Sequence, residues 1–193
     1  MTIRIANKDD LPLLVEIYSD AFRNDPVMNW SLGGPKAIEN VFSSLLRHVF
    51  LPRGTVEVLD NQVATAWLHS RDSKELPPLA GLKLMLTVIY KHGFGVVGRI
   101  SDLEKAMKHH TPKEPHLYLF AIGAMSKSRG KGAGARLLDN MLSKCDNEKE
   151  CVYLENSNPN NHDFYVSRGF TTRSTFRPAS NAPIIEGMWR EPL

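Results

Sequence analysis

The chain has 193 residues, of which 42% are hydrophobic and 23% charged, a composition typical of one globular domain. Its formal net charge of +3 is too small for a protein that binds nucleic acid through a dense basic face. The sequence shows no signal peptide and no run of 18 apolar residues. We therefore expect a single domain over residues 1–193, located in the cytoplasm, without nucleic-acid or membrane partners.

The first third of the chain predicts strands and helices in alternation. Residues 2–6 alternate apolar and polar side chains as a strand does, and Asn7 with Asp10 predicts a capping box at the start of a helix. That helix stops near Pro26, which disfavours helix for its predecessor, and a second helix is expected over about 36–50. Residues 55–59 and 63–69 read as two strands joined by the hairpin turn Asp60-Asn61.

The middle of the chain predicts a helical insert followed by a central strand. Residues 79–110 have helical spacing that is interrupted at Gly93 and Gly95, so two helices are expected. Residues 117–125 are apolar on both alternating faces, which favours a strand covered by helices on each side. Because glycine weakens a strand, Gly123 predicts a bulge or a ligand contact at that position.

The last third predicts one long helix, a strand, a short helix and two more strands. Apolar residues at positions 138, 141, 142 and 145 form one helical stripe, and strands are expected at 151–155, 170–176 and 184–190, with a short helix within 158–169. Cys145 and Cys151 lack the paired spacing of a zinc site and read as reduced thiols. The order of elements predicts an α/β domain, and no metal is expected.

A glycine-rich stretch, "SRGKGAG" at residues 128–134, lies between the central strand and the long helix. A turn of this kind exposes backbone N–H groups at the positive end of the helix dipole, where phosphate binds well. The spacing matches neither the P-loop nor the G-x-G-x-x-G dinucleotide motif. An anion cradle, a basic surface patch and a flexible turn are the three interpretations that the residues alone allow.

The pattern R-x-x-G-x-G, formed by Arg129, Gly132 and Gly134, resembles the acetyl-CoA-binding motif of the GNAT N-acetyltransferases. A second signature of that family is matched downstream by Asn158, Tyr165, Gly169 and Phe170. The stretches "PKEPHLYLFAIGA", "GKGAG" and "FYVSRGF" are also similar to the branch that contains puromycin N-acetyltransferase. The resemblance covers nearly the whole chain and implies the GNAT fold: a central mixed, twisted sheet of about six or seven strands, flanked by helices on both faces, with a helical insert before the central strand.

The resemblance implies acetyl-CoA as the cofactor. The N–H groups of residues 130–134 would bind its pyrophosphate, and a bulge at Gly123 would free the backbone of residues 122–126 for the pantetheine arm. An N–H near Ala124 would polarise the thioester carbonyl. The residues expected to bind the cofactor are Ile122, Ala124, Met125, Arg129, Gly130, Lys131, Gly132, Ala133, Gly134, Asn158 and Asn161.

Two catalytic residues are expected. Tyr165 occupies the position at which family members place a hydroxyl near the sulfur, where it can protonate the departing thiolate; spacing alone would make it a core aromatic. Glu155, at the end of strand 151–155, is the expected general base, since the similar branch also has a glutamate there; the alternative is a surface carboxylate. Asp25 and His69 are weaker candidates for the base.

The predicted function is acetyl transfer from acetyl-CoA to a primary amine, expected to belong to a small molecule, by direct attack in a ternary complex. One alternative is a non-catalytic acyl-CoA-binding or sensor domain, and another is acetylation of a peptide or protein amine. A monomer and a homodimer are both compatible with the sequence.

Overall fold

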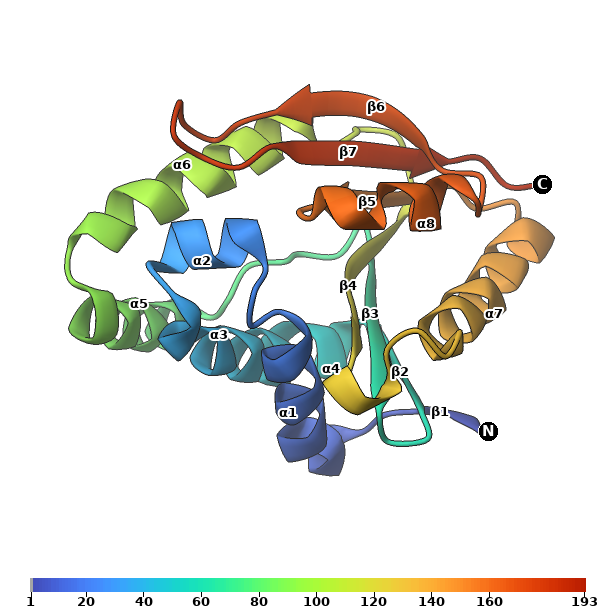
Figure 1. Ribbon diagram of the computed structural model, residues 1–193, viewed down its shortest axis with the longest axis horizontal. Coiled ribbons are helices and arrows are strands. Elements are labelled where there is room, and N and C mark those ends of the chain that lie inside the picture. The colour runs from blue at the N-terminus through green and yellow to red at the C-terminus, as the bar shows by residue number, and fades with distance from the viewer. Residues whose placement is uncertain (1) are drawn as a thin grey trace.

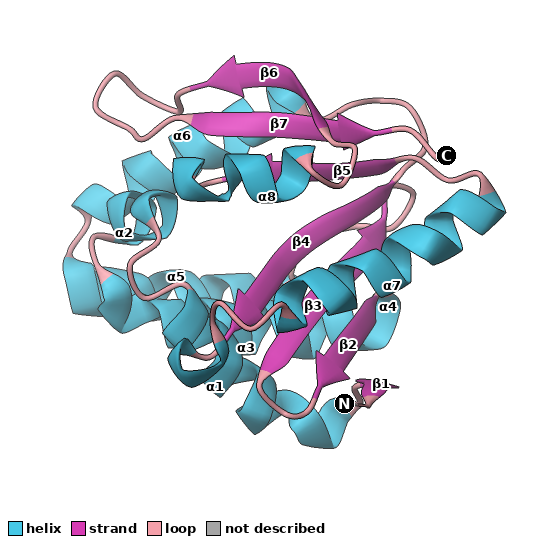
Figure 2. Ribbon diagram, turned by 45° about the vertical axis from the view of Figure 1, so that its right-hand side comes forward, coloured by secondary structure: helices cyan, strands magenta, loops and turns pink. Residues whose placement is uncertain are grey.

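The computed structural model describes residues 2–193, which form one open mixed sheet in the strand order β1-β2-β3-β4-β5-β7-β6 (Figures 1 and 2). Neighbouring strands are antiparallel except β4 and β5, which are parallel. The sheet therefore agrees with the expected GNAT arrangement. The strands are β1 (Ile3–Ile5), β2 (Thr55–Leu59), β3 (Val63–His69), β4 (Leu117–Ala124), β5 (Val152–Asn156), β6 (Thr171–Phe176) and β7 (Ile185–Arg190).

The α-helices flank this sheet and also build the insert before β4. They are α1 (Leu11–Ala21), α2 (Pro26–Leu32), α3 (Ile38–Leu45), α4 (Leu51–Arg53), α5 (Pro78–His92), α6 (Gly95–His110), α7 (Ala133–Glu148) and α8 (His162–Val166). Shorter turns are η1 (Lys8–Asp10), η2 (Pro35–Ala37), η3 (Leu46–Phe50), η4 (Ser126–Ser128) and η5 (Pro159–Asn161). Within residues 2–193, no helix combines the length and the hydrophobicity needed to cross a bilayer.

Local sequence signals explain several boundaries. The Asn7–Asp10 capping box is present and opens η1, which runs into α1. Asp60 and Asn61 both adopt positive φ, at 50° and 54°, as the tight turn between β2 and β3 requires. The insert is a pair of helices, α5 and α6, separated at Gly93, whose φ is +77°. These expectations from the sequence are confirmed.

The region between α1 and β2 differs from expectation in two ways. The first helix ends at Ala21, before Pro26, and Asp25 is extended, as expected, but Pro26 also begins a helix that the sequence did not predict. The Asp25 side chain caps this helix, α2, by accepting the Met28 N–H at 2.8 Å. Proline is well tolerated at this position because its missing N–H would have no partner in the first turn. The helix expected over 36–50 is divided into α3 and the π-helical turn η3, which leads into α4.

The core has two layers because the strands present alternate residues to opposite faces. On one face, Val56 and Val58 of β2 pack with residues of α1, α3 and η3. On the other, Trp67 of β3 and Leu119 of β4 pack with α7 and α8. The central strands are thus covered by helices on both sides.

Gly123 serves close packing, and the expected bulge lies elsewhere. The register between β3 and β4 shifts between Ala66 and Trp67, which leaves Phe120 as the extra residue of β4. A Cβ on Gly123 would lie 2.9 Å from Cβ of Ala21 and 3.0 Å from Cδ1 of Tyr18. The prediction of a bulge at Gly123 was therefore wrong, because glycine is needed there for the approach of α1 to β4.

Candidate active site

The opening of the sheet lies between β4 and β5. These strands pair only at Leu117–Val152, Tyr118–Tyr153 and Leu119–Leu154, and beyond Leu119 they diverge (Figure 2). The extra residue in β4 follows immediately, and a bulge bends the strand that carries it. The expected separation of the central strand from its neighbour is present.

A cavity of about 240 Å³ occupies this opening. Its walls come from β4, the end of β5, the loop before α2, α6 and α8. The predicted site residues that line it are Ile122, Arg129, Glu155, Asn158, Asn161 and Tyr165. Other lining residues, which the sequence did not single out for this site, include Phe22, Met28, Leu103, Met107, Ser157 and Ile185.

The remaining predicted cofactor residues lie between the end of β4 and the first turn of α7. Gly130 and Gly132 both have φ of +73°, a left-handed conformation that favours glycine, and a Cβ on either would meet open space. Among the described residues, no acceptor is found for the N–H groups of residues 130–135. These groups lie at the N-terminus of the 16-residue helix α7, so the turn can bind an anion with backbone donors.

Arg129 fixes this turn to the rest of the protein. Its guanidinium donates to the carbonyl oxygens of Ala124, at 3.2 Å, and Asp20, at 2.9 Å. The Ser126 N–H donates to the Asp20 carboxylate, and the Met125 N–H donates to the Gln62 carbonyl at 2.9 Å. Three backbone groups that we expected to be free for a pantetheine arm therefore have partners within the protein, namely the Met125 and Ser126 N–H groups and the Ala124 carbonyl.

Tyr165 lies on α8 and is only 6% exposed. Its ring packs against Phe164 and Phe170, so the side chain belongs to the core while it lines the cavity. Burial raises the pKa of the hydroxyl, and the nearby Asp25 carboxylate raises it further. The phenol therefore stays protonated at neutral pH, as a proton donor must.

Two carboxylates line the cavity with Tyr165. Burial raises the pKa of Glu155, although the Lys74 ammonium and the nearby hydroxyls of Tyr118 and Tyr153 oppose this shift. Burial is also the main cause that raises the pKa of Asp25, which is 7% exposed. Both carboxylates are thus in surroundings that favour taking up a proton.

The two carboxylates differ in their hydrogen bonds. Asp25 has both oxygens engaged: Oδ1 accepts the Met28 N–H, and Oδ2 accepts the Ser157 hydroxyl. Glu155 Oε1 accepts only a long bond from the Thr111 hydroxyl, at 3.5 Å, and Oε2 is buried without a partner among the described residues. Glu155 therefore has an oxygen that can accept a proton from a ligand, whereas both oxygens of Asp25 are used to connect α2 to the loop after β5.

Asn158 and Asn161 lie where β5 gives way to α8. Asn158 caps η5, because its side chain accepts the Asn160 N–H at 3.1 Å, and its own N–H donates to the Asn156 side chain at 3.3 Å. The capping role that we considered for Asn158 is confirmed, and its place in the cavity wall leaves a binding role open.

Several other polar residues lie outside the cavity lining. His69, a weaker candidate for the base, is bonded to Glu150 at 2.8 Å and does not line the cavity. Burial raises the pKa of Cys145 to about 12 and that of Cys151 to about 11, and neither thiol lines the cavity. His110 stacks on Phe176 with ring centroids 4.1 Å apart.

Asp25, which the sequence suggested only as a weaker candidate for the base, is a central member of the cavity wall. Asp25 and Ser157 are 132 positions apart, and only the fold brings them into contact. The local signal for Asp25 was an aspartate directly before a proline, which is a typical helix start. Recognising α2 would have placed Asp25 at the beginning of a helix, with its side chain fixed there.

Residues 85–170 match the model of the Acetyltransferase (GNAT) family. A solved structure from Corynebacterium glutamicum, described as histone acetyltransferase HPA2 and related acetyltransferase, is similar at a TM-score of 0.73 and 21% identity, covering 100% of this chain and 96% of that one. A polyamine N-acetyltransferase of Drosophila melanogaster is similar at a TM-score of 0.60 and 13% identity, covering 98% and 99%. These structural likenesses concern the fold.

Two curated proteins are similar in sequence. An uncharacterized N-acetyltransferase of Schizosaccharomyces pombe is 35% identical over 77 residues, which cover 39% of this chain and 31% of that protein. A probable serine/threonine-protein kinase of Dictyostelium discoideum is 25% identical over 173 residues, covering 77% and 18%. The chain thus spans less than a third of the length of either relative. Residues 85–170 thus match the model of the GNAT acetyltransferase family, and the chain has the fold of GNAT acetyltransferases along its whole length.

Proposed function

We propose that this protein is an acetyl-CoA-dependent N-acetyltransferase that acts on a primary amine of a small molecule by direct attack in a ternary complex. The observation that carries the proposal is the joint position of two features at the opening between β4 and β5. A turn whose N–H donors have no acceptor in the described part of the chain lies at the start of α7, and a cavity lined by Glu155 and Tyr165 lies between the strands. The first suits a pyrophosphate and the second suits proton transfer.

The chain's own groups fit acetyl-CoA. The N–H groups of residues 130–134 would hold the pyrophosphate, and the cationic residues Arg129 and Lys131 stand next to them in the sequence. The edge of β4 that faces away from β3, around Ile122, is not paired with β5 and would receive the pantetheine arm as an added strand. When bound, acetyl-CoA supplies an acyl carbon activated as a thioester.

Removal of a proton from the acceptor is the first chemical requirement. An amine with a pKa near 10.4 is neutral in roughly one molecule in 2,500 at pH 7, which costs about 4.6 kcal/mol. Glu155 accepts that proton, since its Oε2 has no hydrogen-bond partner within residues 2–193 and its surroundings raise its pKa. Asp25 has a positioning role, because both of its oxygens already hold the helix and loop around the cavity.

Tyr165 completes the transfer on the side of the leaving group. The amine nitrogen forms a bond to the acyl carbon and loses its second proton, the carbon–sulfur bond breaks, and the Tyr165 hydroxyl gives its proton to the sulfur. The second proton from nitrogen restores the Tyr165 hydroxyl through solvent, and the proton that Glu155 took from the ammonium is released to solvent, so the enzyme ends the cycle unchanged. Neither cysteine takes part, because both are protonated and lie outside the cavity lining.

The cavity wall supports a small, partly apolar amine as the acceptor. Carboxylates at Asp25 and Glu155 suit a cationic nitrogen, while Phe22, Leu103 and Met107 offer apolar contacts to the rest of the molecule. The Drosophila neighbour that is named a polyamine N-acetyltransferase is consistent with an acceptor of this size. Alkylamines, arylalkylamines and polyamines are therefore the first compounds to screen.

The first test is isothermal titration of the full chain with acetyl-CoA, coenzyme A and ATP, repeated with Gly132→Asp. We expect the two coenzyme A forms to bind and the variant to lose affinity at least about 100-fold. Aspartate would be strained at a φ of +73° and would place a negative charge where the phosphates lie. Gly98→Asp is the matched control, because the same change on α6 meets open space at ordinary φ.

The second test is release of free thiol from acetyl-CoA in the presence of each amine of the panel. Turnover with any of them supports the transferase. Tight binding of acetyl-CoA without thiol release from any amine, peptides included, would instead support an acyl-CoA sensor. Absence of binding, or equal binding by Gly132→Asp, would refute the assignment of the turn at residues 129–134.

A further inference from the structure

Lys74 lies in the segment that joins β3 to α5, and its ammonium group rests on an aromatic ring of the cavity wall. Its Nζ atom is 3.6 Å from the ring centroid of Tyr118, which is a close cation–π contact. Tyr118 is buried and lines the cavity between β4 and β5, whereas Lys74 is absent from that lining. The ammonium group therefore reaches the cavity wall from outside the cavity.

Tyr118 connects this cation to Glu155 through the paired part of β4 and β5. Tyr118 pairs with Tyr153 in the parallel ladder, and their rings stack with centroids 6.2 Å apart. Side chains two positions apart on a strand share one face of the sheet, so Glu155 lies on the same face as Tyr153. Lys74, Tyr118, Tyr153 and Glu155 thus form one cluster, which we call the Lys74 cluster.

The Glu155 carboxylate has no closer cation than Lys74 in this cluster. Its Oε1 accepts a long bond from the Thr111 hydroxyl at 3.5 Å, and its Oε2 is buried without a partner among the described residues. Within residues 2–193, neither Glu155 nor Lys74 has an ion-pair partner within 4 Å. An ionised carboxylate in such surroundings is costly unless an opposite charge lies nearby. Lys74 supplies that charge, since Tyr118, Tyr153 and Thr111 are neutral.

The electrostatics of the Lys74 cluster agree with this geometry. Burial raises the pKa of Glu155, and enclosure of the Lys74 ammonium group lowers its pKa, while each residue opposes the shift of the other. Gly187, the β7 partner of Glu155, adds no charge. His116 packs edge-on against Tyr153, and burial lowers the pKa of its imidazole, so this ring is neutral at neutral pH.

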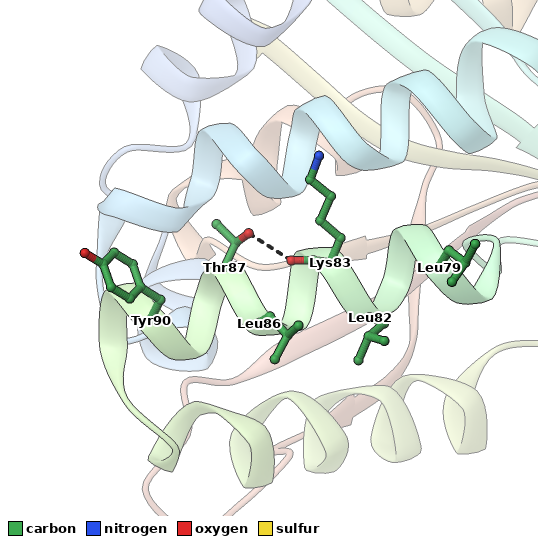
Figure 3. Close-up of a pocket in the computed structure, with 6 residues that line it drawn as sticks. All are labelled: Leu79, Leu82, Lys83, Leu86, Thr87 and Tyr90. Carbon is green, nitrogen blue, oxygen red and sulfur yellow. Dashed lines mark hydrogen bonds between the residues drawn. The ribbon is translucent and has the colours of Figure 1, made fainter.

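Both ends of the helical insert meet at this cluster. Lys74 precedes α5, and Thr111 directly follows α6, so the insert that walls the cavity also brings these two side chains to Glu155. Lys83 of α5 is placed differently: it is exposed and lines a shallow groove on that helix, apart from the cavity (Figure 3). Lys83 is therefore a matched control for Lys74.

We propose that Lys74 is a positioning residue of the reaction: its ammonium group, held against the Tyr118 ring, keeps the buried Glu155 carboxylate ionised and able to take a proton from the acceptor. This role rests on the proposed function, in which Glu155 is the base. Because Lys74 lies outside the cavity lining, we expect its loss to change kcat and to leave the affinity for acetyl-CoA unchanged.

The first experiment follows the Glu155 carboxyl group directly, by carbon-13 NMR titration of the full chain labelled at the carboxyl carbons of its glutamates. The Glu155 signal is assigned by its loss in Glu155→Gln. We expect Lys74→Met to raise the titration midpoint by roughly one pH unit, whereas Lys74→Arg keeps the charge and the midpoint. Lys83→Met should leave it unchanged. An unmoved midpoint in Lys74→Met, or an equal rise in Lys74→Arg, would overturn the proposal.

The second experiment measures kcat against pH for the same variants, with saturating acetyl-CoA and an acceptor found in the amine screen. We expect the acid limb of Lys74→Met to move to higher pH by the same amount, and Lys74→Arg to restore it. Affinity for acetyl-CoA should stay within a factor of about three, because Lys74 lies outside the cavity lining.

The two experiments separate failure of this proposal from failure of the proposed function. The NMR titration needs no acceptor amine, so an unmoved midpoint refutes the role of Lys74 whether or not the protein turns over. A midpoint that rises in Lys74→Met while the acid limb of kcat stays in place would instead refute Glu155 as the base, and with it any part of Lys74 in the reaction.

Discussion

The turn at residues 129–134 presents backbone N–H groups, whereas the cavity between β4 and β5 presents buried side chains. The turn depends on backbone conformation, because Gly130 and Gly132 adopt positive φ. A Cβ added at either position would meet open space. The cavity depends on environment, since burial is the main cause of the shifted pKa values of Asp25, Glu155 and Tyr165. One region is built for holding an anion and the other for moving protons.

This difference determines how each region responds to change. A backbone site has several equivalent donors, so conservative changes of neighbouring side chains remove little of it. A buried titratable group has no substitute, and removal of a general acid or base typically costs 10²–10⁴-fold in rate. The largest expected effects therefore belong to the carboxylates of the cavity.

Glu155→Gln against Asp25→Asn is the sharpest comparison within the cavity. We expect Glu155→Gln to lower kcat about 10²–10⁴-fold, because the amine proton loses its acceptor. Asp25→Asn is expected to lower kcat less than about 10-fold, since asparagine can still accept the Met28 N–H as a helix cap. Initial rates at saturating acetyl-CoA and amine measure both. The reverse order of effects would make Asp25 the base.

The pH profile identifies the same group independently. A base whose pKa is raised by burial is ionised only above that pKa, so kcat of the unmodified enzyme should fall on the acid side at a pH above the ordinary value of 4.5 for glutamate. Glu155→Gln should lose this limb, and its rate should rise with pH as the ammonium group of the acceptor loses its proton. An unchanged acid limb in Glu155→Gln would contradict the role of Glu155.

Stability provides the control for these variants. Because the pKa of Glu155 is raised in the folded protein, the native state binds that proton more tightly than the unfolded chain does. The contribution of the Glu155 carboxyl group to the free energy of unfolding therefore falls as pH rises through its pKa in the native state, and it is regained as pH falls. Glutamine removes this dependence, so Glu155→Gln should be at least as stable as the unmodified protein at pH 7, and lost activity would not reflect unfolding.

Tyr165→Phe is expected to have the next largest effect. Loss of the hydroxyl should lower kcat about 100-fold, while the affinity for acetyl-CoA measured by titration stays within a factor of about three. Tyr18→Phe is the matched control, because that hydroxyl is buried without a partner in the described part of the chain and lies outside the cavity lining. Unchanged turnover in Tyr165→Phe would exclude its hydroxyl as the proton donor.

The turn at residues 129–134 could be located from sequence because its signals are local. The glycine spacing, the preceding apolar strand and the following amphipathic helix all lie within about 30 residues. Residues this close in sequence remain neighbours in the folded protein, so the pattern predicts the site directly. The cavity could be located only in part. Tyr165 and Glu155 were found through family signatures, but the hydrogen bonds of Asp25 with Ser157 and of Arg129 with Asp20 join distant segments.

Proline and glycine produced the errors in the fold because each has two structural meanings. Pro26 both disfavours helix for the residue before it and starts a helix well, and the structure shows both effects, of which the sequence predicted only the first. Gly123 was expected to mark a bulge, yet the extra residue in β4 is Phe120. Only the position of Tyr18 and Ala21 on α1, more than 100 residues earlier, explains the missing side chain.

Gly123→Ala tests this last interpretation and has the smallest expected effect on catalysis. The new methyl group would meet Ala21 and Tyr18 at 2.9 and 3.0 Å, so the free energy of unfolding measured in urea should fall by about 1–3 kcal/mol, as overpacked cores show. Gly98→Ala, in open space on α6, should gain up to about 1 kcal/mol. If Gly123→Ala instead kept its stability and lost affinity for acetyl-CoA, the glycine would be required by the ligand and the packing argument would fail.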